Sequence, residues 1–277
     1  MLELKEGVAK FWNENPCGGG GVYQDRLNWI KATEGYIYEI LNEDLVKDKK
    51  CLEVGCGQGF VSIHVSDWAE EVIGIDISSN SVSVANEGKR KLNKKNVNFL
   101  TGDAENLEFD NDLFDIVYSV GVLHHTPDTQ KGIDEIYRVL KPEGTAMIML
   151  YRKYCSKGMV TCLIRKISSL IDMISGKQFF INGLLQRYYA KKPRGCHGTA
   201  LNELFGCPIL RMYSKKELLS MFQEFKEIKI TCHQPGFARL KDFIPILNCR
   251  WISSFLDFID RTTKNKFGFY WFIEARK

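Results

Sequence analysis

The sequence predicts an α/β fold built on a mostly parallel sheet. From residue 50 onward, strand patterns alternate with helix patterns. The predicted strands are rich in Val and Ile, as expected for strands covered by helices on both faces. A turn containing Gly55, Gly57 and Gly59 follows the first strand. With 277 residues and 44% hydrophobic content, the chain can bury one sizeable core and carry a covering lid.

Residues 1–49 are expected to form an N-terminal helical cap. A short first helix ends in the loop FWNENPCGGGG, whose glycines cannot continue it. Apolar residues between Leu27 and Leu41 then recur at helical spacing. We therefore expect helices before the first strand.

Residues 50–151 are expected to form the α/β core. Val/Ile-rich strands and amphipathic helices alternate here, and Lys141, Pro142 and Gly144 indicate a helix end followed by a turn. Such alternation favours right-handed parallel crossovers. The predicted strands are CLEVG, EVIGIDI, VNFLTGD, FDIVYSVGVL and TAMIMLY.

Residues 152–212 interrupt this alternation and are expected to be a helical lid insertion, since about 60 residues exceed an ordinary connection. Residues 213–277 then complete the core. Ser214 and Glu217 have the spacing of a capping box. The strand KEIKITCH, an irregular aromatic stretch and the strand FGFYWFIEAR follow.

Composition predicts a cytoplasmic protein. The nine cysteines are scattered, odd in number and lack a C-x-x-C pair, which favours a reducing compartment and predicts no metal site. No signal peptide or membrane-spanning run is expected. The net charge of +4 is uneven: residues 151–195 hold ten Lys or Arg against Asp172, a charge of +9, which leaves −5 elsewhere.

The glycine turn and two strand-end acids point to a nucleotide-like cofactor. The spacing G-x-G-x-G ends at Gly59, and Phe60 occupies the third glycine position of a dinucleotide fingerprint. Asp76 ends the second strand, where it could accept hydrogen bonds from ribose hydroxyls or cap the next helix. Asp103 ends the third strand, where it could accept from an adenine amine or cap a turn.

Several segments together resemble the class I S-adenosylmethionine-dependent methyltransferases, closest to the small-molecule group that contains quinone-biosynthesis methyltransferases. The matching segments cover roughly residues 50–151 and read LEVGCGQG, GIDIS, GDAENLEF, FDIVYSVGVLHHTPD and RVLKPEGTAMI. The resemblance implies a Rossmann-like seven-stranded sheet of order 3-2-1-4-5-7-6 with strand 7 antiparallel. It also implies S-adenosylmethionine as cofactor and S-adenosylhomocysteine as product.

The resemblance assigns cofactor-binding roles to residues around the strand ends. Those bordering the methionine part are Glu53, Gly55, Cys56, Gly57 and Gly59. Asp76 and Ile77 are implied for the ribose and adenine, Asp103 and Ala104 for the adenine, and Ser119, Val120 and Gly121 for the inner wall. By their position in the N-terminal cap, Tyr23 and Arg26 could cover the cofactor and meet its carboxylate.

Candidate catalytic residues are histidines. His124 and His125 follow the fourth strand at the mouth of the crevice, and an imidazole has a pKa suited to a general base. The pair also fits a loop-and-helix-start feature of the family. His197, in the insertion, could approach from the lid.

The acceptor is expected to be a small molecule under a basic lid, methylated on O, N or C. The amphipathic, basic segment 152–194 also suits an anionic membrane surface, with a lipid or quinone-like acceptor and a peripheral location. A tRNA or rRNA acceptor is a further alternative because basic and aromatic residues can track phosphates. The last alternative is a partner protein that binds the cofactor without catalysing a reaction. The oligomeric state is left open.

Overall fold

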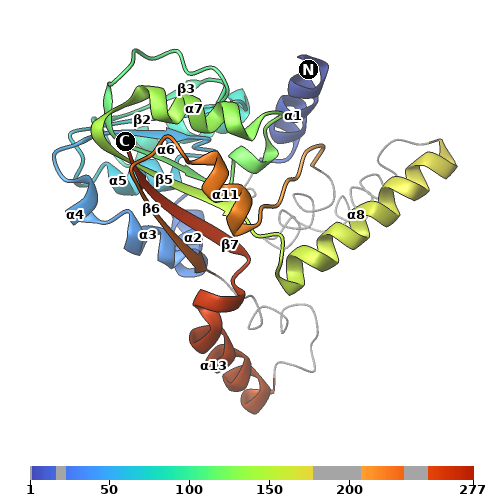
Figure 1. Cartoon of the computed structure of the whole chain (residues 1–277). Helices are drawn as coiled ribbons and strands as arrows, with labels where there is room; N and C mark the ends of the chain where they lie inside the picture. The colour runs from blue at the N-terminus through green and yellow to red at the C-terminus, as the bar shows by residue number, and fades with distance from the viewer. Residues whose placement is uncertain (1, 17–22, 177–206, 234–248) are drawn as a thin grey trace.

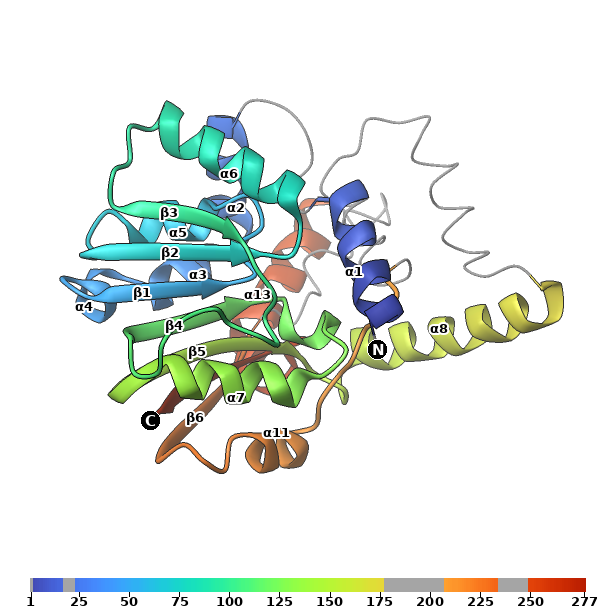
Figure 2. The same ribbon diagram turned by 90° about the horizontal axis from the view of Figure 1, so that it is seen from above.

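The chain folds around one seven-stranded sheet with helices on both faces (Figures 1 and 2). This computed structural model describes residues 2–16, 23–176, 207–233 and 249–277. The strand order is β3-β2-β1-β4-β5-β7-β6 and only β7 runs antiparallel to its neighbours, so the predicted topology is confirmed. The strands are β1 (Lys50–Val54), β2 (Glu71–Asp76), β3 (Val97–Thr101), β4 (Phe114–Val120), β5 (Leu140–Tyr151), β6 (Glu227–His233) and β7 (Tyr270–Arg276).

Each face of the sheet carries its own apolar core. One core joins the sheet to α2 (Tyr23–Thr33), α3 (Gly35–Ile40), α5 (Phe60–Val65) and α6 (Ser79–Lys91). The other joins it to α7 (Thr129–Val139) and α11 (Lys215–Met221), and its members include the fully buried Ile133, Ile136 and Phe222. The central strands are therefore buried on both sides, which explains why they read as Val/Ile runs.

The N-terminal cap is helical, as expected, but its second part is broken into pieces. After α1 (Leu2–Glu14), the predicted helical stripe divides into α2, α3 and α4 (Glu43–Val46). Glu34 separates α2 from α3, and the side chain of Asn42 caps α4. Leu27, Ile37 and Leu41 are buried in the core of the sheet domain, so these helices pack as part of it.

Two local predictions in the C-terminal half of the sheet domain are corrected by the structure. The aromatic stretch expected to be irregular contains an 18-residue helix, α13 (Arg250–Phe267), in which Trp251, Phe255 and Phe258 recur at helical spacing. The turn expected at 141–144 lies within β5, where Glu143 takes a left-handed φ of 66°. The capping box of Ser214 and Glu217 is confirmed at the start of α11.

The insertion is described only in part. Helix α8 (Ser156–Ser175) follows β5 and projects away from the sheet (Figures 1 and 2). Residues 207–212 are described, whereas His197 and the rest of 177–206 lie outside the described residues. None of the described helices is both long and apolar enough to cross a membrane.

Candidate functional site

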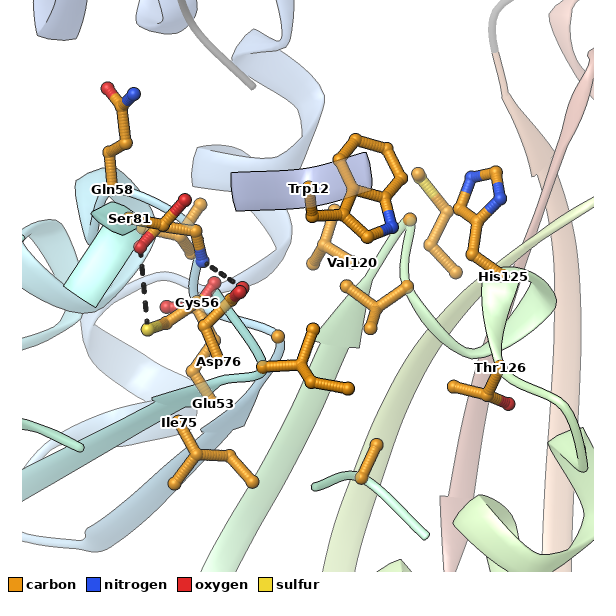
Figure 3. A pocket seen from close by; sticks show the side chains of 18 of the residues that line it. Trp12, Glu53, Cys56, Gln58, Ile75, Asp76, Ser81, Val120, His125 and Thr126 are labelled. Carbon is orange, nitrogen blue, oxygen red and sulfur yellow. Dashed lines mark hydrogen bonds between the residues drawn. The ribbon is translucent and has the colours of Figure 1, made fainter. Parts of the chain in front are cut away.

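A cavity of about 310 Å³ lies at the carboxyl ends of the parallel strands, with α1 across it. This is where an open α/β sheet binds ligands. Figure 3 shows Glu53 and Asp76 on one side, His125 and Thr126 on the other, and Trp12 of α1 between them. The residues that line it from the β1–β3 side include Glu53, Gly55, Cys56, Gly57, Asp76, Ile77, Asp103 and Ala104. Those from the β4, β5 and β7 side include Val120, Gly121, His125, Met149, Tyr151 and Tyr270.

The carboxylate of Asp76 holds the glycine turn in place. Its Oδ2 accepts from the backbone N–H of Gly57 at 2.8 Å, and its Oδ1 accepts from that of Ser78 at 2.8 Å. The cap of α6 is Ser78, which accepts from Ser81, so the helix-capping alternative for Asp76 was wrong. Burial raises the pKa of Asp76, although these two hydrogen bonds act to lower it. Each oxygen retains a lone pair for a ligand hydroxyl.

The turn needs glycine for two different reasons. Gly55 and Gly57 both have a left-handed φ, of 83° and 51°. A Cβ on Gly55 would lie 2.2 Å from the side chain of Val122, whereas a Cβ on Gly57 would meet no atom within 4 Å. Gly55 is thus required by packing. Gly57 borders the open cavity and leaves room for a ligand.

Replacing these glycines by alanine should separate folding from ligand binding. We expect Gly57→Ala to cost only the left-handed strain of about 1–2 kcal/mol, yet to weaken cofactor binding at least tenfold because its methyl enters the cavity. Gly55→Ala should lower the melting temperature more than Gly57→Ala. Thermal unfolding and calorimetric titration measure the two effects; equal melting temperatures with unchanged binding would contradict this account.

Helix α1 is fixed over the β3 side of the cavity by an ion-pair cluster. The ammonium of Lys5 lies 2.7 Å from Oδ2 of Asp103 and 2.7 Å from Oε2 of Glu105. Burial opposes the charge on Lys5, but the two carboxylates outweigh it and raise its pKa. Oδ1 of Asp103 accepts from the N–H of Glu105, so the expected turn-capping contact is present too. At the other end of α1, the side chain of Asn13 accepts from Ser78.

Glu53 is a buried acid at the centre of the site. Its side chain lines the cavity and accepts from Ser62, whose hydroxyl also accepts from Tyr118. Burial raises the pKa of Glu53 to about 8, although the hydrogen bond from Ser62 acts to lower it. Glu53 therefore holds its proton more tightly than a free carboxyl group does, and a cation bound beside it would lower its pKa again.

The raised pKa of Glu53 predicts a pH-dependent stability. Between the ordinary pKa of 4.5 and the folded value of about 8, the unfolded chain ionises Glu53 while the folded chain keeps it protonated. The contribution of Glu53 to stability is therefore complete below pH 4.5 and lost as pH rises through 8. Denaturant unfolding at several pH values should show a steeper loss of stability between pH 4.5 and 8 for wild type than for Glu53→Gln. Parallel curves would contradict the assignment.

The charges around the cavity favour a cationic ligand. Among the described residues that line it, Glu34, Asp76 and Asp103 carry carboxylates, Glu53 carries a carboxyl group that a nearby cation would help to ionise, and Lys5 carries an ammonium. Lys5 is already paired with two acids. A pyrophosphate would meet this acidic wall unfavourably, whereas a sulfonium and an ammonium would be attracted by it. The residues present therefore fit S-adenosylmethionine better than a dinucleotide.

Comparison with known proteins agrees with this geometry. Residues 52–148 match the family profile described as "Methyltransferase domain". Residues 52–148 are a methyltransferase domain. The uncharacterized methyltransferase YcgJ of Bacillus subtilis is 33% identical over 102 residues, which are 37% of this chain and 40% of that protein. Its crystal structure superposes with a TM-score of 0.53, at 18% identity over 88% of this chain and 98% of that one.

Two other relatives carry named activities. The ubiquinone biosynthesis O-methyltransferase of Coxiella burnetii is 33% identical over 56% of this chain and 57% of its own length. A Haemonchus contortus phosphoethanolamine N-methyltransferase, solved with phosphomonomethylethanolamine and S-adenosylhomocysteine, has a TM-score of 0.53 at 17% identity, over 99% of this chain and 57% of that one. The chain thus spans little more than half of these two relatives.

The methyltransferase domain brings most of the predicted cofactor residues to one cavity. Four lie outside its lining: Gly59, Ser119, Tyr23 and Arg26. Gly59 is the N-cap of α5, and Ser119 donates to the carbonyl of Val54. Tyr23 donates to the carbonyl of Gln58, and the guanidinium of Arg26 lies over the ring of Phe60. All four thus contact or belong to the glycine turn, the end of β1 or the start of α5.

The two predicted histidines have different surroundings. His125 lines the cavity, with its ring 5.3 Å from that of Trp12. Its Nδ1 lies 2.7 Å from the carbonyl oxygen of Ile209. His124 is fully buried against Tyr151 and does not line the cavity, and burial lowers its pKa well below the usual value. Of these two histidines, His125 alone lines the cavity.

The sequence reasoning missed the cavity residues contributed by α1, α3 and β7. Lys5, Trp12, Ile37 and Tyr270 line the cavity although they are far from the family motifs. Their contribution depends on how α1 crosses the strand ends and on β7 lying beside β5. The one available signal was the amphipathic pattern of α1, which indicates packing without giving its partner.

Proposed function

We propose that the chain binds S-adenosylmethionine beside β1, β2 and β3 and methylates a small apolar acceptor held against β4, β5 and β7. The observation that carries this proposal is a cavity with acids at the strand ends and an apolar, aromatic wall containing one histidine. Asp76 would hold the ribose hydroxyls, and Glu53 would face the cationic methionine part. The bound cofactor supplies an electrophilic methyl group, and the protein supplies alignment, exclusion of water and a proton acceptor.

His125 is proposed as the general base. A carbonyl oxygen can only accept a hydrogen bond, so Nδ1 of His125 carries the hydrogen directed at Ile209. Nε2 of the neutral ring then holds the lone pair. During methyl transfer, Nε2 would take the proton that the acceptor atom gives up. This chemistry suits a hydroxyl or an acidic carbon.

The aromatic wall supports an apolar acceptor. Met149, Tyr151 and Tyr270 line the cavity from neighbouring strands, and Tyr151 and Tyr270 pair in the sheet. Transfer of apolar surface to such a wall contributes about 25 cal/mol per Å². A substituted ring or an alkyl chain gains more from it than a strongly hydrated metabolite. A ubiquinone biosynthesis O-methyltransferase is among the relatives of this chain, which agrees with this class of acceptor.

The proposal is tested with S-adenosylmethionine carrying a labelled methyl group. The protein is incubated with it and with the organic-soluble fraction of a cell extract. We expect S-adenosylhomocysteine and a labelled product that partitions into the organic phase. The amount of product formed by the Asp76→Ala variant defines the background. Product at no more than that background level, from both organic and aqueous fractions, would contradict methyl transfer.

A further inference from the structure

Helix α8 presents its apolar side to solvent. It projects from the sheet in both views (Figures 1 and 2). Each exposed apolar residue lies three or four positions from another one, so they form one stripe, and their exposed fractions run from 48 to 76%. We call this the α8 stripe; it comprises Met159, Leu163, Ile167, Leu170, Met173 and Ile174.

Among the described side chains of α8, two that lie outside the stripe, those of Cys162 and Arg165, contact the protein. The guanidinium of Arg165 donates to the carbonyl of Cys207 at 3.1–3.2 Å, and the thiol of Cys162 lies 3.8 Å from the sulfur of Met212. An ordinary surface helix packs its apolar side inward. The reversed arrangement of α8 indicates that its apolar stripe is covered by something outside the described fold.

A second exposed apolar helix leaves the same end of the sheet. α13 exposes Trp251 (87%), Phe255 (60%) and Phe258 (62%). α8 follows the carboxyl end of β5, and α13 precedes the start of antiparallel β7, whose Tyr270 pairs with Tyr151 of β5. Both tyrosines line the cavity. The two helices therefore flank the apolar side of the site.

We propose that the α8 stripe, together with the aromatic residues of α13, docks the protein on the surface of an anionic lipid bilayer. The charge pattern favours an anionic lipid surface as the partner. Lys166 is exposed on α8, and the 20 residues that follow the end of α8, 176–195, include five Lys or Arg and no Asp or Glu. α8 is about 30 Å long, yet neither it nor another described helix can span a bilayer. An amphipathic helix of this kind lies in the headgroup plane, and exposed Trp suits that interface.

Docking there would place the apolar wall of the cavity next to a source of apolar acceptors. That consequence rests on the proposed function, but the docking itself does not require methyl transfer. A vesicle-binding experiment therefore tests it alone. Failure of docking would leave the cofactor site and its chemistry unaffected.

The test is co-sedimentation of the full chain with vesicles of phosphatidylcholine and phosphatidylglycerol, compared with phosphatidylcholine alone. We expect retention on the anionic vesicles at low salt and release as salt rises, because the attraction is screened. The double variant Leu163→Gln, Leu170→Gln should lower the partition coefficient at least tenfold. Glutamine keeps the helix propensity of leucine nearly unchanged.

A matched control uses two leucines outside the surface. Leu100 on β3 and Leu219 on α11 are 49% and 47% exposed, close to the 59% and 51% of Leu163 and Leu170. The double variant Leu100→Gln, Leu219→Gln should change the partition coefficient less than twofold. Equal losses in both double variants, or no retention of wild type on anionic vesicles at low salt, would overturn the proposal. Two further results without vesicle binding would also overturn it. One is retention of the protein on tRNA, and the other is a wild-type dimer that the α8 variant does not form.

Discussion

Asp76→Ala is expected to weaken binding of S-adenosylhomocysteine at least 100-fold. The substitution removes the carboxylate that accepts from the backbone of Gly57 and Ser78 at 2.8 Å and that faces the cavity. Hydrogen bonds to a charged group contribute about 1.5–3 kcal/mol each, and about 1.4 kcal/mol corresponds to a factor of ten. Loss of both the proposed ribose contacts and the shape of the turn accounts for the expected size. Isothermal titration calorimetry measures it directly.

A surface acid supplies the control for Asp76. Asp67 is exposed and pairs with Lys94, so Asp67→Ala should leave the dissociation constant within twofold of wild type. Circular dichroism separates lost binding from lost folding. If folded Asp76→Ala binds the nucleoside as tightly as wild type, the assignment of the ribose site is wrong.

His125→Asn is expected to lower kcat by a factor of about 10²–10⁴, the usual contribution of a general base, while cofactor affinity changes less than threefold. Asparagine can still donate a hydrogen bond to the carbonyl of Ile209, which accepts from Nδ1 at 2.7 Å in wild type. It has no basic nitrogen to take a proton. The measurement is steady-state turnover of a hydroquinone probe with a short alkyl chain, followed across pH.

The pH profile distinguishes proton transfer from a structural role. Wild type should lose kcat/KM on the acidic side as a histidine protonates, and His125→Asn should lack that limb. His124→Asn is the matched control because His124 is buried outside the cavity; it should lower the melting temperature and keep the limb. If His125→Asn keeps the acidic limb and His124→Asn loses it, His124 is the general base and the assignment of His125 is wrong.

Local signals in the sequence were sufficient for the sheet. The glycine turn, the strand-end acids and the Val/Ile runs are each set by contacts within one strand–helix unit, and the family resemblance supplied the order of the strands. Asp76 shows the limit of such reasoning. Its position at the end of β2 was predictable, but the choice of Ser78 as the cap of α6 depended on backbone conformation.

The remaining parts of the site depend on long-range packing. Lys5 meets Asp103 across 98 residues, and Tyr270 lies beside Tyr151 only because β7 inserts next to β5. No local pattern predicts such pairs. α13 is a different case, since Trp251, Phe255 and Phe258 carried a helical period that was available in the sequence. The prediction treated these aromatic residues as part of an irregular stretch and did not use their spacing.

The most direct test of the cofactor assignment is calorimetric titration of the wild-type protein with S-adenosylhomocysteine, S-adenosylmethionine, NAD⁺ and FAD. The acidic cavity of Glu53, Asp76 and Asp103 predicts saturable one-to-one binding of both sulfur nucleosides and no binding of either dinucleotide. Heat from NAD⁺ or FAD, with none from the sulfur nucleosides, would contradict the account.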